Sequence, residues 1–311
     1  MSSQLASFLD NLRLLTCVTL LKDEGVDSAE VASKSFRGLY VTRYPNPTHI
    51  IFYIHGGGFV SGSPEAISPY LLQLGVELQA RGVKADIFSA GYDLAPENPF
   101  PRALEQIVSA FREHLSRRRK PVIMVSDSAG GNLTLAFLRH LVDPHPEVPA
   151  CDEDGQNGAS RVIAACLASP WVDLRNSSDS IIRNAGHDCL DKPALDRWRN
   201  AYLGDRPLDS WASPAAYEGS WREIMPRSVL LMSGELDMFL SDVISLFRAM
   251  KKDGVESVDL CVEPLKGHVW HLIDFGGTIP GKEASSVDEG EAGAYTGVVV
   301  QADWISRCCV E

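Results

Sequence analysis

The stretch Val122–Leu133 reads VIMVSDSAGGNL. Its first four residues, VIMV, form an uninterrupted apolar run, typical of a strand buried on both faces of a sheet. Small residues then lead into a helical pattern, so the stretch predicts a strand, a sharp turn and a helix. In such a turn the hydroxyl of Ser128 projects at the carboxyl end of the strand. The alternative is a Ser/Asp helix cap followed by a glycine turn, and taken alone the stretch leaves both open.

The same alternation extends along the chain on both sides of this stretch. Apolar runs bounded by turn signals predict parallel strands at 49–54, 85–90, 121–126, 162–168, 229–233 and 258–262. Helical patterns predict helices at 66–81, 102–117, 131–142, 193–203, 241–252 and 299–309. This order predicts a single α/β domain over residues 1–311, with a mostly parallel, twisted sheet and helices on both faces.

Some segments do not fit the alternation. Residues 143–160 and 276–297 are rich in Gly, Pro, Ser or acidic side chains, and we expect a polar surface excursion and a flexible loop, respectively. The N-terminal segment shows apolar residues at helical spacing. Together with residues 175–222, residues 1–30 or so are expected to form a helical lid over the sheet.

A second signal directly follows the strand expected at 49–54: His55-Gly56-Gly57-Gly58-Phe59. Consecutive glycines let backbone N–H groups point at a developing oxyanion, so Gly57 and Gly58 are expected to form an oxyanion hole with the N–H of Ala129. A phosphate-binding loop is excluded because no Gly-Lys-Ser/Thr follows. His55 is expected to support the loop through hydrogen bonds.

A base and an orienting carboxylate for Ser128 follow later strands. Asp237 comes after the strand at 229–233, and His268 comes after the strand at 258–262. Parallel strands end at one edge of a sheet, so the three side chains are expected to converge as nucleophile, orienter and general base. The competitors are less favourable: Glu235 is expected to face away, while Asp242 and His271 are expected inside helices.

Composition narrows the classes of function. With 29 basic and 41 acidic residues the net charge is −12, which disfavours binding to nucleic acid. Seven irregularly spaced cysteines suggest free thiols in a reducing compartment. We expect no membrane span and no signal peptide, hence a cytoplasmic protein. No metal or other cofactor is expected.

Taken together, these motifs resemble those of the hormone-sensitive-lipase-like α/β-hydrolases, which include carboxylesterases and arylacetamide-deacetylase-like enzymes. Two further blocks support the resemblance: YDLAPENPFP at residues 92–101 and SPWVDL at residues 169–174. The resemblance implies a serine hydrolase with a lid, acting without a cofactor on small or medium ester substrates. Homodimerisation is left open.

The chain departs from the family pattern at several places. Ser126 stands where the family usually has glycine, and Asp93 replaces the usual arginine, with Arg102 as its expected new partner. The N-terminal strand pair is expected to be short and the loop at 276–297 long. Acyl transfer, amide hydrolysis or non-hydrolytic cyclisation or condensation at the same triad stays open. A small-molecule receptor is disfavoured because His268 is retained.

Overall fold

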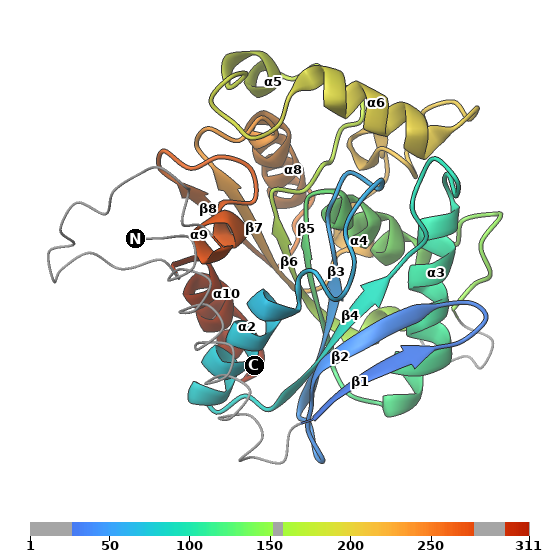
Figure 1. The fold of residues 1–311 in the computed structure, drawn as a ribbon, viewed down its shortest axis with the longest axis vertical. Coiled ribbons are helices and arrows are strands. Elements are labelled where there is room, and N and C mark those ends of the chain that lie inside the picture. The colour runs from blue at the N-terminus through green and yellow to red at the C-terminus, as the bar shows by residue number, and fades with distance from the viewer. Residues whose placement is uncertain (1–26, 152–157, 277–295, 311) are drawn as a thin grey trace, which may run out of the picture.

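The computed structural model describes residues 27–151, 158–276 and 296–310. Within these residues the strands form one eight-stranded sheet in the order β1-β2-β4-β3-β5-β6-β7-β8 (Figure 1). The strands are β1 (Asp27–Ala32), β2 (Arg37–Arg43), β3 (His49–Ile54), β4 (Ala85–Gly91), β5 (Val122–Asp127), β6 (Val162–Ala168), β7 (Ser228–Gly234) and β8 (Ser257–Glu263). The strands from β3 to β8 pair in parallel, while β2 pairs antiparallel with both β1 and β4.

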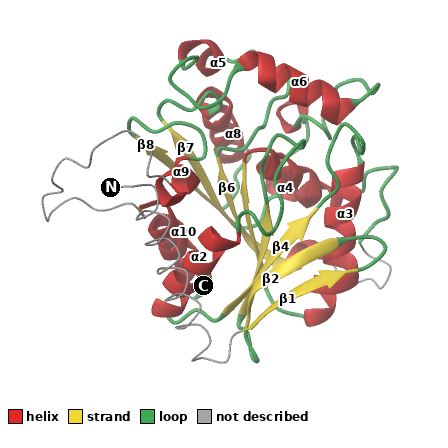
Figure 2. Ribbon diagram, in the orientation of Figure 1, coloured by secondary structure: helices red, strands yellow, loops and turns green. Residues whose placement is uncertain are grey.

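Helices cover both faces of the sheet (Figure 2). On one face α2 (Ser68–Ala80) and α10 (Thr296–Cys308) pack against the strands, and on the other face lie α3 (Arg102–Ala110), α4 (Ser128–His140) and α8 (Leu240–Lys252). Successive residues of β3 therefore point to opposite faces of the sheet. Tyr53 packs in the core under α2 and α10, and Phe52 packs in the core under α3, α4 and α8. Because both faces are covered, every residue of β5 is buried, and the predicted α/β architecture is confirmed.

The N-terminal edge of the sheet carries the strand pair that the family resemblance implied. All six predicted parallel strands are present, and β1 and β2 extend the sheet by an antiparallel pair. Residues 27–30, expected in the lid, belong to β1. The position of this strand was not predicted, because its sequence, DSAEVA, is polar and mostly exposed. The other residues of that expected lid segment, 1–26, lie outside the described residues.

Several predicted helices have different limits, and two of them show why. The helix expected at 102–117 is α-helical only to Ala110 and continues as a π-helix (Phe111–Leu115) and a 3₁₀ turn (Ser116–Arg118). The helix expected from residue 131 begins at Ser128, because the sharp turn itself forms its first residues. Most of the expected loop at 276–297 lies outside the described residues, as do 152–157 of the expected excursion.

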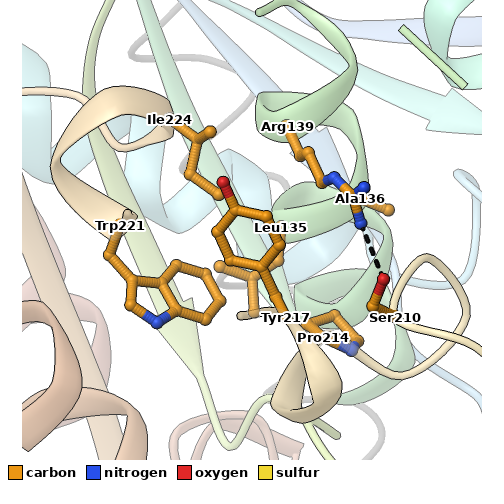
Figure 3. Close-up of a pocket in the computed structure, with 8 residues that line it drawn as sticks. All are labelled: Leu135, Ala136, Arg139, Ser210, Pro214, Tyr217, Trp221 and Ile224. Carbon is orange, nitrogen blue, oxygen red and sulfur yellow. Dashed lines mark hydrogen bonds between the residues drawn. The ribbon is translucent and has the colours of Figure 1, made fainter. Parts of the chain in front are cut away.

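The segment 175–222 divides into two parts. Its first part contains α5 (Asp179–Arg183) and α6 (Lys192–Leu203), which lie together at one end of the sheet (Figure 1). Its second part carries a 3₁₀ turn (Pro214–Ala216) and leads into α7 (Trp221–Ile224). That part lies along the flank of α4, where Tyr217, Trp221 and Arg139 line a small pocket (Figure 3). That residues 175–222 form a lid stays a prediction.

The remaining elements connect this framework. They are a 3₁₀ turn (Gly158–Arg161) and α9 (Trp270–Gly276), which follows β8. Nowhere in the described ranges is a helix both long and apolar enough to cross a membrane.

Candidate active site

Ser128 lies at the junction of β5 and α4, in a left-handed backbone conformation with φ of 50°. Non-glycine residues rarely adopt this conformation, and the surrounding structure must hold it in place. Close packing does so: a Cβ at residue 130 would lie 2.1 Å from the carbonyl oxygen of Ile54, and a Cβ at residue 131 would lie 2.6 Å from Pro170 Cβ. The two glycines after the serine are therefore a steric requirement of the turn.

His268 and Asp237 meet Ser128 at this edge of the sheet. His268 Nε2 lies 2.9 Å from Ser128 Oγ, and His268 Nδ1 lies 3.3 Å from Asp237 Oδ1. The turn after β7 places Asp237, and the turn between β8 and α9 places His268. The same Asp237 oxygen accepts the N–H of Phe239 at 2.8 Å, which holds the carboxylate toward the imidazole. The three residues predicted to converge are thus brought together.

His268 and Asp237 each favour the charged form of the other. Burial by itself lowers the pKa of His268, but the charge of Asp237 and the hydrogen bond to it outweigh burial, and the pKa is raised above its usual value. For Asp237 burial favours the neutral acid, yet the neighbouring His268 and several hydrogen bonds leave the pKa of the carboxyl lowered. With Asp237 ionised, the imidazole keeps its proton on Nδ1 and leaves Nε2 free to accept from the serine hydroxyl.

The competing acids and histidine lie elsewhere. Glu235 is exposed and accepts the N–H of Leu265 at 3.0 Å. Asp242 lies within α8 and accepts a hydrogen bond from Ser178, and burial raises its pKa to about 6. His271 lies within α9, where burial lowers its pKa to about 3. None of these three side chains is bonded to Ser128 in the described structure.

The glycine loop follows β3 directly. Gly57 and Gly58 have φ of 105° and 62°, values that favour glycine. The carbonyl of Gly57 accepts the N–H groups of Val60 and Ser61, which closes the loop on itself. A Cβ on Gly58 would lie 2.8 Å from the ring of Trp198, so α6 packs closely over the loop. Ala129 is the second residue of α4, and N–H groups of a first helical turn have no partner within the helix.

Two buried residues hold this loop. The ring of His55 stacks on Tyr92 at 4.2 Å, its Nδ1 lies 2.7 Å from the Gly56 carbonyl oxygen, and burial lowers its pKa to about 4. Asp127, which precedes the serine, accepts the N–H of Gly56 at 3.0 Å and the hydroxyl of Tyr53. Asp127 was missed in the sequence, where its only signal is an acidic residue at the end of a buried strand.

Among the described residues, no three His, Cys, Asp or Glu side chains are grouped so as to hold a metal ion.

Comparison with known proteins adds to this geometry. A family model described as alpha/beta hydrolase fold matches residues 51–272. The chain belongs to this family. The α/β-hydrolase chain is 32% identical over 225 residues to an acetyl-hydrolase of Streptomyces hygroscopicus, covering 71% of this chain and 68% of that protein. It is 31% identical to an esterase of Acinetobacter venetianus, covering 57% of this chain and 54% of the relative.

Further matches indicate which group of α/β-hydrolases the chain resembles. Mouse hormone-sensitive lipase is 40% identical over 97 residues, which cover 29% of this chain and 12% of the lipase. A crystal structure of an esterase/lipase from an uncultured bacterium superposes with a TM-score of 0.70 at 26% identity, covering 92% of this chain and 86% of that one. The predicted resemblance to hormone-sensitive-lipase-like hydrolases is thereby confirmed.

Proposed function

We propose that this α/β-hydrolase cleaves carboxylic esters of small or medium organic substrates through an acyl-enzyme on Ser128. The contact series from Ser128 Oγ to His268 Nε2 and from His268 Nδ1 to Asp237 Oδ1 carries the proposal. Family membership and the relatives named esterase and acetyl-hydrolase support carboxylesterase-type hydrolysis.

The reaction follows from these positions. His268 Nε2 takes the proton of Ser128 Oγ as the oxygen attacks the ester carbonyl carbon. The N–H groups of Gly57, Gly58 and Ala129 stabilise the resulting oxyanion. The positive charge of the His268 imidazolium is stabilised by Asp237, and the imidazolium then protonates the departing alcohol. A water molecule gives a proton to His268 as it attacks the carbonyl carbon of the acyl-enzyme. The bond between Ser128 Oγ and the acyl carbon then breaks, His268 returns the proton to Oγ, and the acid is released.

The test compares wild type with Ser128→Ala on p-nitrophenyl esters from acetate to long chains. Because removal of the nucleophile leaves only binding and oxyanion stabilisation, kcat should fall by at least about 10⁴-fold. Ser126→Ala is the matched control, since its hydroxyl is bonded to Thr134 and not to His268, and it should keep activity. Retained activity in Ser128→Ala would refute the assignment of Ser128 as the nucleophile. A folded wild type that forms acyl-enzyme but transfers the group only to alcohols or amines would refute hydrolysis.

A further inference from the structure

A carboxylate from the α5–α6 segment, here called the lid, contacts the backbone of the candidate triad. The proposed mechanism assigns this carboxylate no role. Asp188 lies between α5 and α6. Its Oδ1 accepts the backbone N–H of His268 at 2.9 Å, and its Oδ2 accepts the backbone N–H of Met238 at 2.7 Å. Met238 directly follows Asp237. One side chain therefore bridges the turn that carries the acid and the turn that carries the histidine.

The approach of Asp188 depends on a glycine. A Cβ at residue 267 would lie 3.0 Å from Asp188 Oδ1, tighter than ordinary van der Waals contact. Gly267 thus leaves room for the carboxylate beside the N–H of the next residue. The position is defined by sterics as well as by hydrogen bonds.

The same lid stretch holds the acid turn at two other points. Asn184 Nδ2 donates to the carbonyl of Asp237 at 2.8 Å, and Ser180 Oγ donates to the carbonyl of Met238 at 2.7 Å. These contacts secure the acid turn, and Asp188 extends the connection to the histidine turn. The 3.3 Å separation between His268 and Asp237 is therefore set partly from the lid.

Several charges face His268 from the elements around it. Asp237 follows β7, Asp127 ends β5 and Asp188 comes from the lid; these carboxylates favour the imidazolium and raise the pKa of His268 against the effect of burial. His271 in α9 also lies close enough to interact with His268, but burial keeps it neutral. Removing the charge of Asp188 therefore acts on His268 in a defined direction, toward a lower pKa.

We propose that Asp188 is a positioning residue, which holds the acid and histidine turns in register and couples the lid to the triad. This inference rests on the proposed ester hydrolysis at Ser128. Asp188 acts through two backbone N–H groups and through its charge, and it does not contact the reacting atoms.

The experiment measures kcat and KM of the full chain for p-nitrophenyl acetate across pH in wild type, Asp188→Asn and Asp188→Glu. Asn keeps the size but loses the charge and one acceptor. Because misplacement of a catalytic group by about 1 Å lowers rates on the order of 10²-fold, kcat on the pH plateau should fall about 10- to 100-fold, with KM little changed. The acid limb of kcat/KM should move to lower pH, since it reports the free imidazole. Glu retains the charge, so its acid limb should stay near that of wild type while its plateau falls.

Asp191→Asn is the matched control. Asp191 lies in the same lid stretch and also accepts a backbone N–H, that of Ala194 at 2.7 Å, but it caps α6. Its plateau and acid limb should coincide with those of wild type.

Each other outcome has a definite meaning. An Asp188→Asn profile that coincides with wild type overturns the proposal, and so does a lowered plateau with an unmoved acid limb, which indicates a structural role alone. If Asp188→Asn does not fold, Asp188→Glu decides: an unaltered plateau overturns the proposal. Failure of the proposed function is separate, because it appears as an inactive wild type or an active Ser128→Ala.

Discussion

Ser126, near the end of β5, is the first departure from the family pattern, and the structure shows how its side chain is accommodated two residues before Ser128. Its Oγ lies 2.9 Å from Thr134 Oγ1, and Thr134 Oγ1 lies 2.9 Å from the carbonyl oxygen of Gly130. The extra hydroxyl is therefore bonded to a residue of α4 within a buried hydrogen-bonded group. At this position serine ties the strand to the helix that follows it.

Replacing Ser126 by glycine should lower stability and spare activity. The variant loses one buried hydrogen bond, worth about 1 kcal/mol, and gains chain entropy in the unfolded state worth about 0.5–1 kcal/mol. We expect the free energy of unfolding in urea to fall by about 1–2 kcal/mol, with hydrolysis of p-nitrophenyl acetate unchanged. Thr134→Val removes the same bond, so the double variant should lose less than the sum. Additive losses would show that the two hydroxyls are not coupled.

Asp93 is the second departure from the family pattern, and its expected partner is confirmed. Arg102 Nε lies 3.1 Å from Asp93 Oδ2, and Gln106 Nε2 lies 2.9 Å from the same oxygen. Both members of the ion pair are about one third exposed, so the pair contributes little to stability. The altered charge is compensated locally.

At the level of elements, the loop after β3 depends on its fit against the turn after β5. In Gly56→Ala the new methyl would lie 2.2 Å from Asp127 Oδ2 and 2.9 Å from Ser128 Cβ. Asp127 is buried and held by Tyr53, so the loop must move instead. Because oxyanion donors are effective only in position, kcat/KM for p-nitrophenyl acetate should fall on the order of 10²-fold.

The control for this loop variant is Gly82→Ala. Gly82 has φ of 77° and open space around it, so the alanine introduces backbone strain of about 1–2 kcal/mol without a steric clash. It should lose stability in urea and keep its activity. Equal activity in both variants would mean that the position of the glycine loop does not limit the reaction.

Elements that bury both faces could be predicted from the sequence, and so could the residues at their ends. Apolar runs such as β5 have no other interpretation at their length, and parallel strands bring their carboxyl ends to one edge. The convergence of Ser128, Asp237 and His268 at one edge could be predicted for that reason. The position of β1 was missed because an exposed edge strand needs few apolar residues. Asp188 was missed because its partners are backbone N–H groups 50 and 80 residues away, a relation that leaves no pattern in the sequence.

For the molecule as a whole, buried histidines link folding to pH. Burial lowers the pKa of His55 to about 4 and that of His271 to about 3. In the unfolded chain both groups take up a proton near pH 6.5. Between that pH and the folded values, acidification therefore favours unfolding. Asp242 acts in the opposite direction, because burial raises its pKa to about 6 and the folded state then binds the additional proton.

Since these groups oppose each other, the contribution of one histidine is best isolated by difference. The variant His55→Gln can still donate a hydrogen bond to the Gly56 carbonyl but takes up no proton. We therefore expect it to lack the part of the acid destabilisation that His55 causes. As the pH falls from 6.5 toward 4.5, wild type should lose stability relative to the variant, with a slope that approaches about 1.4 kcal/mol per pH unit. Urea unfolding at half-unit pH steps measures this difference, with identical buffers and ionic strength. A difference that stays constant over this range would show that His55 is already protonated in the folded protein, and that its stacking on Tyr92 does not require the neutral ring.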